Sequence, residues 1–203
     1  MIRGIIFDCF GVLYHGSLGH LRELTPIEKL QEMNDLSHAS DRGYISHDDY
    51  FSQVGELIGR SKDEVKKIIQ QNHVRNEPMI EQVRLLKGSH KTALLSNVGY
   101  GVIQGLFSDQ ELRELFDVVV LSSDVKMAKP DMEIFQYVAA RLDLAPAECL
   151  MVDDLTENID GAIMSGMQGI LCADTQQCIS DINDALVLDS RSSLGFGEGL
   201  KDA

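Results

Sequence analysis

The stretch IIFDCFGVLY, residues 5–14, decides the fold of this chain. It opens with apolar residues that do not alternate with polar ones, which is typical of a short strand buried on both faces of a parallel sheet. Asp8 stands where this strand is expected to end, and Gly11 follows in a turn. A carboxylate at a buried strand end is either an ordinary loop residue or a functional group, and the rest of the sequence has to distinguish the two.

Four more short apolar runs follow along the chain, at residues 92–95, 118–121, 149–152 and 169–173. Segments with helical periodicity lie between them, and one of these segments places Ile134, Phe135, Val138, Ala139 and Leu142 on a single stripe. Alternating strands and helices predict an α/β fold with a doubly wound, Rossmann-like parallel sheet.

More than 80 residues separate the first strand from the second, which is far more than one crossover helix needs. Residues 16–77 are polar with helical apolar stripes, and a structureless loop of that length would be unusual in a compact domain. We therefore predict a core domain of residues 1–15 and 78–203 and an inserted helical cap of residues 16–77. Pro78 is expected to open the helix that returns to the sheet.

Composition limits the possible partners of this 203-residue chain. A net charge of -14 disfavours a nucleic-acid partner, because phosphate backbones are bound by Lys and Arg surfaces. No apolar run approaches the roughly 20 residues that cross a bilayer, and Asp8 interrupts the first run, so neither a membrane segment nor a secretory signal is expected. The four cysteines lack metal-binding spacing and are interpreted as reduced thiols. We expect a cytoplasmic protein, as a monomer or homodimer.

Polar residues follow each predicted strand, and parallel strands bring their carboxyl ends to one edge of the sheet, where ligands bind. Two of these groups, Asp8 and Asp154, offer the hard oxygen ligands that suit Mg²⁺. A cation would also explain why several carboxylates are tolerated together. The remaining groups at this edge could bind a phosphate: Ser96, the backbone amide of Asn97, and Lys129, which adds positive charge.

The same residues stand in four segments that resemble, in order, the four motifs of the haloacid dehalogenase (HAD) superfamily. The segments are FDCFGVL, LLSN, KMAKPD and MVDDLTEN. The insertion after the first motif matches the position of the helical C1 cap of subfamily IA. The segment RGYIS, residues 42–46, is similar to a cap element of the glucose-1-phosphatase-like subgroup, which includes sugar-phosphate phosphatases.

The resemblance implies a Mg²⁺-dependent phosphatase of a small phosphorylated metabolite, such as a sugar phosphate, that works through an aspartyl-phosphate. Asp8 would be the nucleophile, and Lys129 would act with it and contact the substrate. The roles implied for the other residues are substrate binding by Ser96 and Asn97, Mg²⁺ binding by Asp8, the Phe10 carbonyl and Asp154, and support by Asp153 and Asn158.

The sequence departs from the family pattern at Phe10, where HAD phosphatases usually have an aspartate that acts as general acid and base. Such assistance contributes typically about 10²- to 10⁴-fold to the rate. Three interpretations stay open: a phosphatase that works without this acid, a non-catalytic HAD-fold protein that binds a ligand or partner, and a 2-haloacid dehalogenase. The last is disfavoured, because Asp153 and Asp154 beside Asp8 would repel an anionic haloacid in the absence of a cation.

Three further residues have two possible roles each. His15 follows the first motif and could replace part of the missing acid, or it could be a solvated histidine of the hinge. Arg42 and Tyr44 could face the substrate from the cap, or they could belong to an exposed helix–turn surface.

Overall fold

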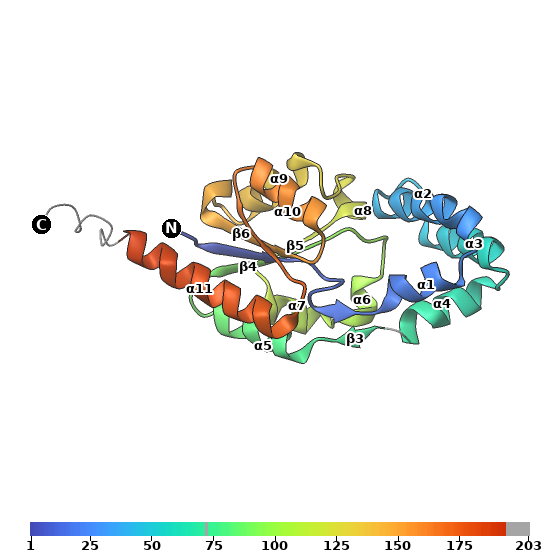
Figure 1. Ribbon diagram of the computed structural model, residues 1–203, viewed down its shortest axis with the longest axis horizontal. Helices are drawn as coiled ribbons and strands as arrows, with labels where there is room; N and C mark the ends of the chain where they lie inside the picture. The colour runs from blue at the N-terminus through green and yellow to red at the C-terminus, as the bar shows by residue number, and fades with distance from the viewer. Residues whose placement is uncertain (72, 194–203) are drawn as a thin grey trace, which may run out of the picture.

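The structure is a computed structural model that describes residues 1–71 and 73–193. Its centre is a five-stranded parallel sheet in the order β5–β4–β1–β6–β7 (Figure 1). The strands are β1 (Gly4–Phe7), β4 (Lys91–Ser96), β5 (Val118–Leu121), β6 (Cys149–Asp153) and β7 (Gln168–Leu171). The predicted Rossmann-like α/β core is therefore confirmed, and the first strand lies in the middle of the sheet.

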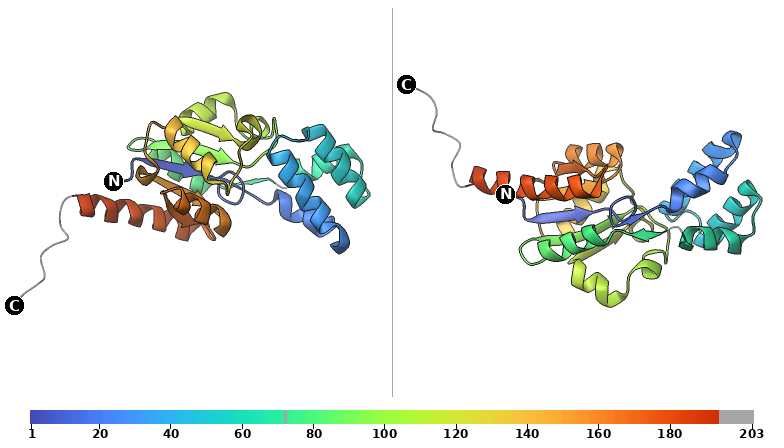
Figure 2. Two further views of the ribbon diagram at one scale, coloured as in Figure 1. Left: turned by 90° about the horizontal axis from the view of Figure 1, so that it is seen from above. Right: turned by 60° about the horizontal axis from the view of Figure 1, so that its bottom comes forward.

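Helices cover both faces of this sheet (Figures 1 and 2). α9 (Met132–Arg141) and α10 (Thr156–Met164) lie on one face, and α5 (Glu77–Leu86) and α11 (Thr175–Ser193) lie on the other. Successive residues of β1 serve the two faces in turn, because Ile6 belongs to one apolar cluster while Ile5 and Phe7 belong to the other. This two-sided burial is the reason that the strand reads as an unbroken apolar run.

The long insertion forms a separate bundle of four helices at one end of the sheet (Figure 1). These are α1 (Ser17–Leu24), α2 (Leu30–Asp41), α3 (His47–Ile58) and α4 (Lys62–Gln71). The bundle has its own apolar core, which includes Leu21, Met33, Val54 and Val65. We refer to it as the cap.

The chain passes between core and cap through a two-stranded antiparallel ribbon of β2 (Tyr14–His15) and β3 (Val74–Arg75). Asn76 fixes this crossing, because its side chain donates to the Val12 carbonyl at 2.7 Å and its backbone N–H donates to the Leu13 carbonyl at 2.9 Å. The domain boundaries drawn from the sequence stay a prediction, and both fall beside this ribbon.

The remaining elements are short. They are α6 (Ile103–Leu106), α7 (Asp109–Leu115), α8 (Ser122–Val125) and the 3₁₀ turns Ile27–Lys29 and Pro146–Glu148. All four cysteines are unpaired and buried. In the part of the chain that the structure describes, no helix is long and apolar enough to cross a bilayer.

Candidate active site

The carboxyl edge of the sheet gathers the polar residues that follow the strands. Asp8 comes directly after β1, Ser96 ends β4 and Asp153 ends β6. Lys129 lies in the loop between α8 and α9 and reaches the same place. All four side chains are buried. The parallel topology accounts for the convergence of the three strand-end residues, since neighbouring parallel strands end side by side.

Lys129 joins the carboxylates of two strands. Its Nζ lies 2.8 Å from Oδ1 of Asp8 and 2.6 Å from Oδ2 of Asp153. Burial by itself would lower the pKa of Lys129, but Asp8 and Asp153 outweigh burial and raise it. The lysine is therefore held as a cation inside the site.

Asp153 is fully engaged by the protein. While its Oδ2 accepts from Lys129, its Oδ1 accepts from Nδ2 of Asn158 at 2.9 Å and from the backbone N–H of Leu155 at 2.9 Å. Both oxygens thus have protein partners, and Asp153 is suited to orienting Lys129 and the loop that follows β6. This geometry fits the supporting role expected for Asp153 and Asn158.

The donor set at this edge fits a hard cation. Among the described residues, Asp8, Asp153 and Asp154 bring ligand oxygens within 4.8 Å of one another. Burial and the neighbouring acids raise the pKa of Asp8 against the opposing effect of Lys129, and burial followed by Asp153 raises that of Asp154. One lysine faces three carboxylates, so a divalent ion would relieve the excess negative charge. Lys129 and the Cys9 N–H both use Oδ1 of Asp8, which leaves Oδ2 for other chemistry.

Gly11 provides the space in which Asp154 lies. Its φ of +85° is in the left-handed region, and a Cβ built there would stand 2.1 Å from the carboxyl carbon of Asp154. The turn after β1 therefore approaches Asp154 as closely as a bare backbone allows. The Asp154 carboxylate can occupy its position because residue 11 has no side chain, although the two residues are far apart in the sequence.

Gly11→Ala is expected to displace the Asp154 carboxylate. Backbone strain at positive φ costs about 1–3 kcal/mol of unfolding free energy, and a misplaced ligand typically weakens metal affinity about 10- to 100-fold. Titration of activity with Mg²⁺, together with thermal melts, measures both effects. Gly101→Ala is the matched control, because its φ is +82° and its Cβ would meet nothing within 4 Å. Equal Mg²⁺ requirements in the two variants would contradict this account of the site.

The last residue of β4, Ser96, and the residue after it, Asn97, have different tasks. Oγ of Ser96 is buried and has no hydrogen-bond partner among the described residues, so it is free to donate to a ligand oxygen. The Asn97 side chain is occupied instead, donating to the Lys129 carbonyl at 2.8 Å and accepting from the Lys129 N–H at 2.9 Å. Asn97 thus holds the lysine loop in place, a role that its type and position in the sequence did not indicate.

A cavity of about 70 Å³ lies between the cap and this edge of the sheet. Phe10 and Asn97 line it from the core, and the Phe10 ring packs on that of His73 with centroids 5.3 Å apart. On the cap side it is lined by Asp41, which the sequence interpretation did not single out. Asp41 directly precedes the RGYIS segment, and this adjacency was the only feature of the sequence that could have indicated a place for Asp41 near the site.

The three residues with open roles are placed as follows. Arg42 donates to Asp131 of the core at 3.0 Å, so it joins the cap to the core. Tyr44 is 70% exposed and belongs to the cap surface. His15 is exposed on strand β2 of the ribbon between core and cap.

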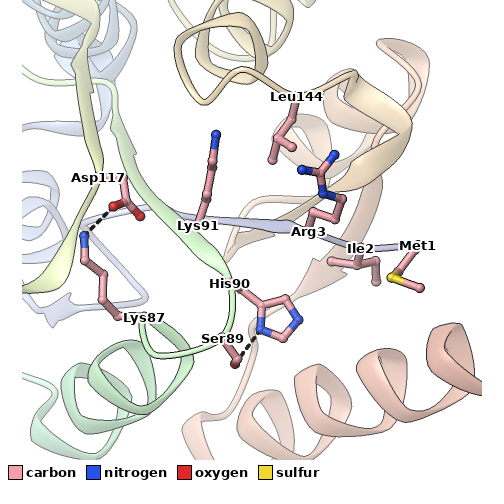
Figure 3. Close-up of a pocket in the computed structure, with 9 residues that line it drawn as sticks. All are labelled: Met1, Ile2, Arg3, Lys87, Ser89, His90, Lys91, Asp117 and Leu144. Carbon is pink, nitrogen blue, oxygen red and sulfur yellow. Dashed lines mark hydrogen bonds and ion pairs between the residues drawn. The ribbon is translucent and has the colours of Figure 1, made fainter.

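A second and larger cavity, about 430 Å³, lies at the opposite end of the sheet (Figure 3). Lys91, at the start of β4, and Arg3 line it beside Lys87. Lys87 pairs with Asp117 at 2.8 Å, and Arg3 pairs with Glu148 at 2.8 Å. Its size does not make it the active site, because it is remote from the acid cluster and two of its cations are already paired.

Comparison with known proteins identifies the family of this chain. The family model described as haloacid dehalogenase-like hydrolase matches residues 2–166. The chain is 30% identical over 182 residues to the sesquiterpene phosphatase astK of Aspergillus oryzae, covering 85% of this chain and 91% of astK. It is 26% identical to a D-ribitol-5-phosphate phosphatase of Bacteroides thetaiotaomicron, covering 78% of this chain and 86% of that protein.

A solved structure shows the same fold. The HAD family enzyme bt-2542 of Bacteroides thetaiotaomicron, in complex with magnesium and inorganic phosphate, has a TM-score of 0.70 and 20% identity, covering 84% of this chain and 94% of that one. The four ordered motifs, the parallel sheet and the family match agree. This chain belongs to the haloacid dehalogenase-like hydrolases.

Proposed function

We propose that this hydrolase is a Mg²⁺-dependent phosphatase of a small phosphorylated metabolite. The observation that carries the proposal is the Ser96 hydroxyl, which has no hydrogen-bond partner among the described residues and lies at the same sheet edge as Lys129 and Asp8. Together these three residues offer a donor, a cation and a nucleophile to one phosphate. The phosphatase names of the two relatives support the same reaction class. Asp8, the Phe10 carbonyl and Asp154 would hold the ion.

The protein's own groups account for the steps. An oxygen of Asp8 attacks phosphorus, the bond to the alcohol oxygen breaks, and an aspartyl-phosphate forms on Asp8. Lys129 and Ser96, with the backbone amide of Asn97, hold the equatorial oxygens while charge develops on them. Water then attacks the same phosphorus, phosphate leaves, and the carboxylate of Asp8 is restored. Bound Mg²⁺ supplies charge neutralisation at the phosphate and the carboxylates.

The acid cluster argues against a dehalogenase. A 2-haloacid is an anion that would approach the three carboxylates of Asp8, Asp153 and Asp154. Lys129 pairs with the first two of them, at 2.8 Å and 2.6 Å. Carboxylates in this number repel such a substrate unless a metal ion accompanies them. Halide release from a 2-haloacid without metal is therefore the outcome that would replace the proposed reaction.

The two relatives are named for different phosphate esters, one of a sesquiterpene and the other D-ribitol 5-phosphate. The cavity beside Phe10 carries both kinds of wall, apolar at Phe51 and Val102 and polar at Ser37 and Asn97. The proposal therefore extends to the class of phosphate monoesters, and a substrate panel is needed to select the alcohol.

A panel of phosphate monoesters is expected to show Mg²⁺-dependent phosphate release. Suitable compounds are ribitol 5-phosphate, fructose 1-phosphate, glucose 1-phosphate, farnesyl monophosphate and 4-nitrophenyl phosphate. Treatment with EDTA should reduce turnover to the uncatalysed background, and added Mg²⁺ should restore it, because three carboxylates and one lysine cannot hold a phosphate dianion unaided. If no compound is hydrolysed with Mg²⁺ present, a non-catalytic binding protein becomes the better explanation.

A further inference from the structure

Phe10 has no proton to transfer, so a poorly departing alcohol needs an acid from elsewhere in the site. We propose that Asp41, the last residue of cap helix α2, donates the proton to the leaving alcohol and afterwards activates the hydrolytic water. This inference rests on the phosphatase function proposed above. It assigns to the cap a chemical role in addition to enclosing the substrate.

The backbone of Asp41 is fixed to the core. Its carbonyl accepts a short hydrogen bond from Oγ of Ser122, the residue after β5, and the same Oγ accepts from the Val98 N–H at 2.9 Å. The next residue, Arg42, pairs with Asp131 of the core. Gly43 then packs on Ser123, where a Cβ would lie 3.0 Å from the Ser123 carbonyl oxygen. Three successive residues thus hold this end of α2 against the strand ends.

The side chain of Asp41 lines the cavity that Phe10 and Asn97 line from the core. No hydrogen bond or ion pair among the described residues reaches the Asp41 carboxylate. A structural role in such a contact therefore does not explain why an acid stands at this position. The position is also unfavourable for an acid, because the negative end of the α2 dipole repels a carboxylate in the last turn. A carboxylate kept at an unfavourable place, unpaired and lining a cavity with Phe10, the second residue after the nucleophile, is suited to proton transfer.

The groups that surround Asp41 keep its pKa in the range that suits a general acid near neutral pH. Burial raises its pKa to about 6, while Lys129 from the core and Arg42 from its own segment act in the opposite direction. Asn97, which holds the Lys129 loop, lines the same cavity as Asp41, so this cavity borders the reacting edge. His47 and Tyr50 of α3 line the same cavity, as does His73 on the chain that returns to the core. Burial lowers the pKa of both histidines and raises that of Tyr50.

The proton balance closes over one turnover. As Asp8 attacks phosphorus, the protonated Asp41 gives its proton to the alcohol oxygen and the neutral alcohol leaves. The resulting carboxylate then takes a proton from the water that attacks the aspartyl-phosphate, and this step restores both Asp8 and protonated Asp41. The net reaction is phosphate monoester plus water giving alcohol plus inorganic phosphate.

His73 is the competing candidate, because its ring packs on Phe10 and its Nδ1 is buried without a hydrogen-bond partner among the described residues. That nitrogen is shut off from solvent and therefore also from a substrate in the cavity. The open carboxylate of Asp41 is the better placed group. A His73→Asn variant tests this choice directly.

The test compares leaving groups. An alkyl oxygen needs a proton to depart, whereas 4-nitrophenolate is stable enough to leave without one. In Asp41→Asn, kcat/KM for the alkyl phosphates of the panel should fall about 10²- to 10⁴-fold, and that for 4-nitrophenyl phosphate should fall far less. The matched control is Asp35→Asn, which removes an equal charge from the exposed face of the same helix and should change neither value.

Two further measurements separate chemistry from structure. For alkyl phosphates, wild-type kcat/KM should decline as pH rises through about 6, the pKa of Asp41, because the protonated form is the donor. In Asp41→Asn, this decline in the pH profile of kcat/KM should be absent. Phe10→Asp placed in the Asp41→Asn background should raise alkyl phosphate turnover at least about tenfold, since it supplies the acid at the other wall of the same cavity. Thermal melts check that each variant is folded.

Several results would overturn the assignment of Asp41. The first is that kcat/KM of Asp41→Asn falls equally for alkyl and aryl phosphates, or falls for neither. The second is that the wild type hydrolyses only the aryl phosphate. The third is that His73→Asn, and not Asp41→Asn, shows a loss that depends on the leaving group. Each of them leaves the phosphatase function intact. A wild type inactive on every ester would instead reject the proposed function and, with it, the role of Asp41.

Discussion

Asp8→Asn should eliminate turnover of every phosphate ester that the wild type hydrolyses. Removing a nucleophile that forms the covalent intermediate typically costs about 10⁴- to 10⁶-fold in kcat. The amide has nearly the shape of the carboxylate, but it is not nucleophilic and cannot carry the phosphoryl group. Steady-state assays with Mg²⁺ and trapping of the aspartyl-phosphate in acid-quenched wild type measure both parts of the prediction.

The fold should tolerate this substitution. Burial raises the pKa of Asp8, which means that its ionised form opposes folding above its unfolded pKa. Removing that charge should leave the thermal midpoint near pH 7 unchanged or higher. Loss of activity together with a preserved melting transition would therefore report chemistry. Substantial turnover by folded Asp8→Asn would show that another group attacks phosphorus.

Lys129→Met is expected to have the largest effect on stability. Lys129 is 3% exposed and bridges Asp8 and Asp153, so its removal leaves two buried carboxylates without their cation. Breaking a buried ion pair from one side typically costs about 3–5 kcal/mol of unfolding free energy. Activity should fall as well, because the phosphate loses its cationic partner. Urea unfolding at fixed pH, with and without Mg²⁺, measures the stability loss.

The matched control is Lys126→Met, which removes an exposed lysine from the same loop without changing the acid cluster. Its unfolding free energy should stay within about 0.5 kcal/mol of the wild type. Mg²⁺ should restore part of the stability of Lys129→Met, because an ion that binds only the folded carboxylate cluster stabilises it by mass action. Equal losses in the two lysine variants would mean that Lys129 does not neutralise the cluster.

The core of the fold was predictable because its strands carry their own signal. A strand that is buried on both faces must be apolar throughout, so β1, β4, β5 and β6 appear in the sequence as short apolar runs bounded by polar residues. The topology rule then brings the residue after each strand to one edge. Asp8, Ser96 and Asp153 were therefore expected together before any coordinates were known. Lys129 was harder to place, because it reaches the edge from a loop that Asn97 holds.

The cap was predictable only in outline. Amphipathic periodicity indicates which face of a helix is buried, but it does not indicate which surface of the core that helix meets. Asp41 and His73 have ordinary positions in the sequence, at a helix end and in a connecting segment. They reach the cavity beside Phe10 because Asp41, Arg42 and Gly43 contact core residues that lie 80 to 89 positions further along the chain.

The sequence by itself determined the α/β core, the helical insertion and the identity of the groups at the strand ends, because these depend on local apolar patterns and on the fixed geometry of parallel strands. Only the tertiary structure decided how those groups are used. It showed that Gly11 makes room for Asp154, that Asn97 holds the lysine loop and that Asp41 lines the cavity beside Phe10 from the cap. The physical reason is distance along the chain: each of these contacts joins residues more than 30 positions apart, where sequence periodicity carries no information.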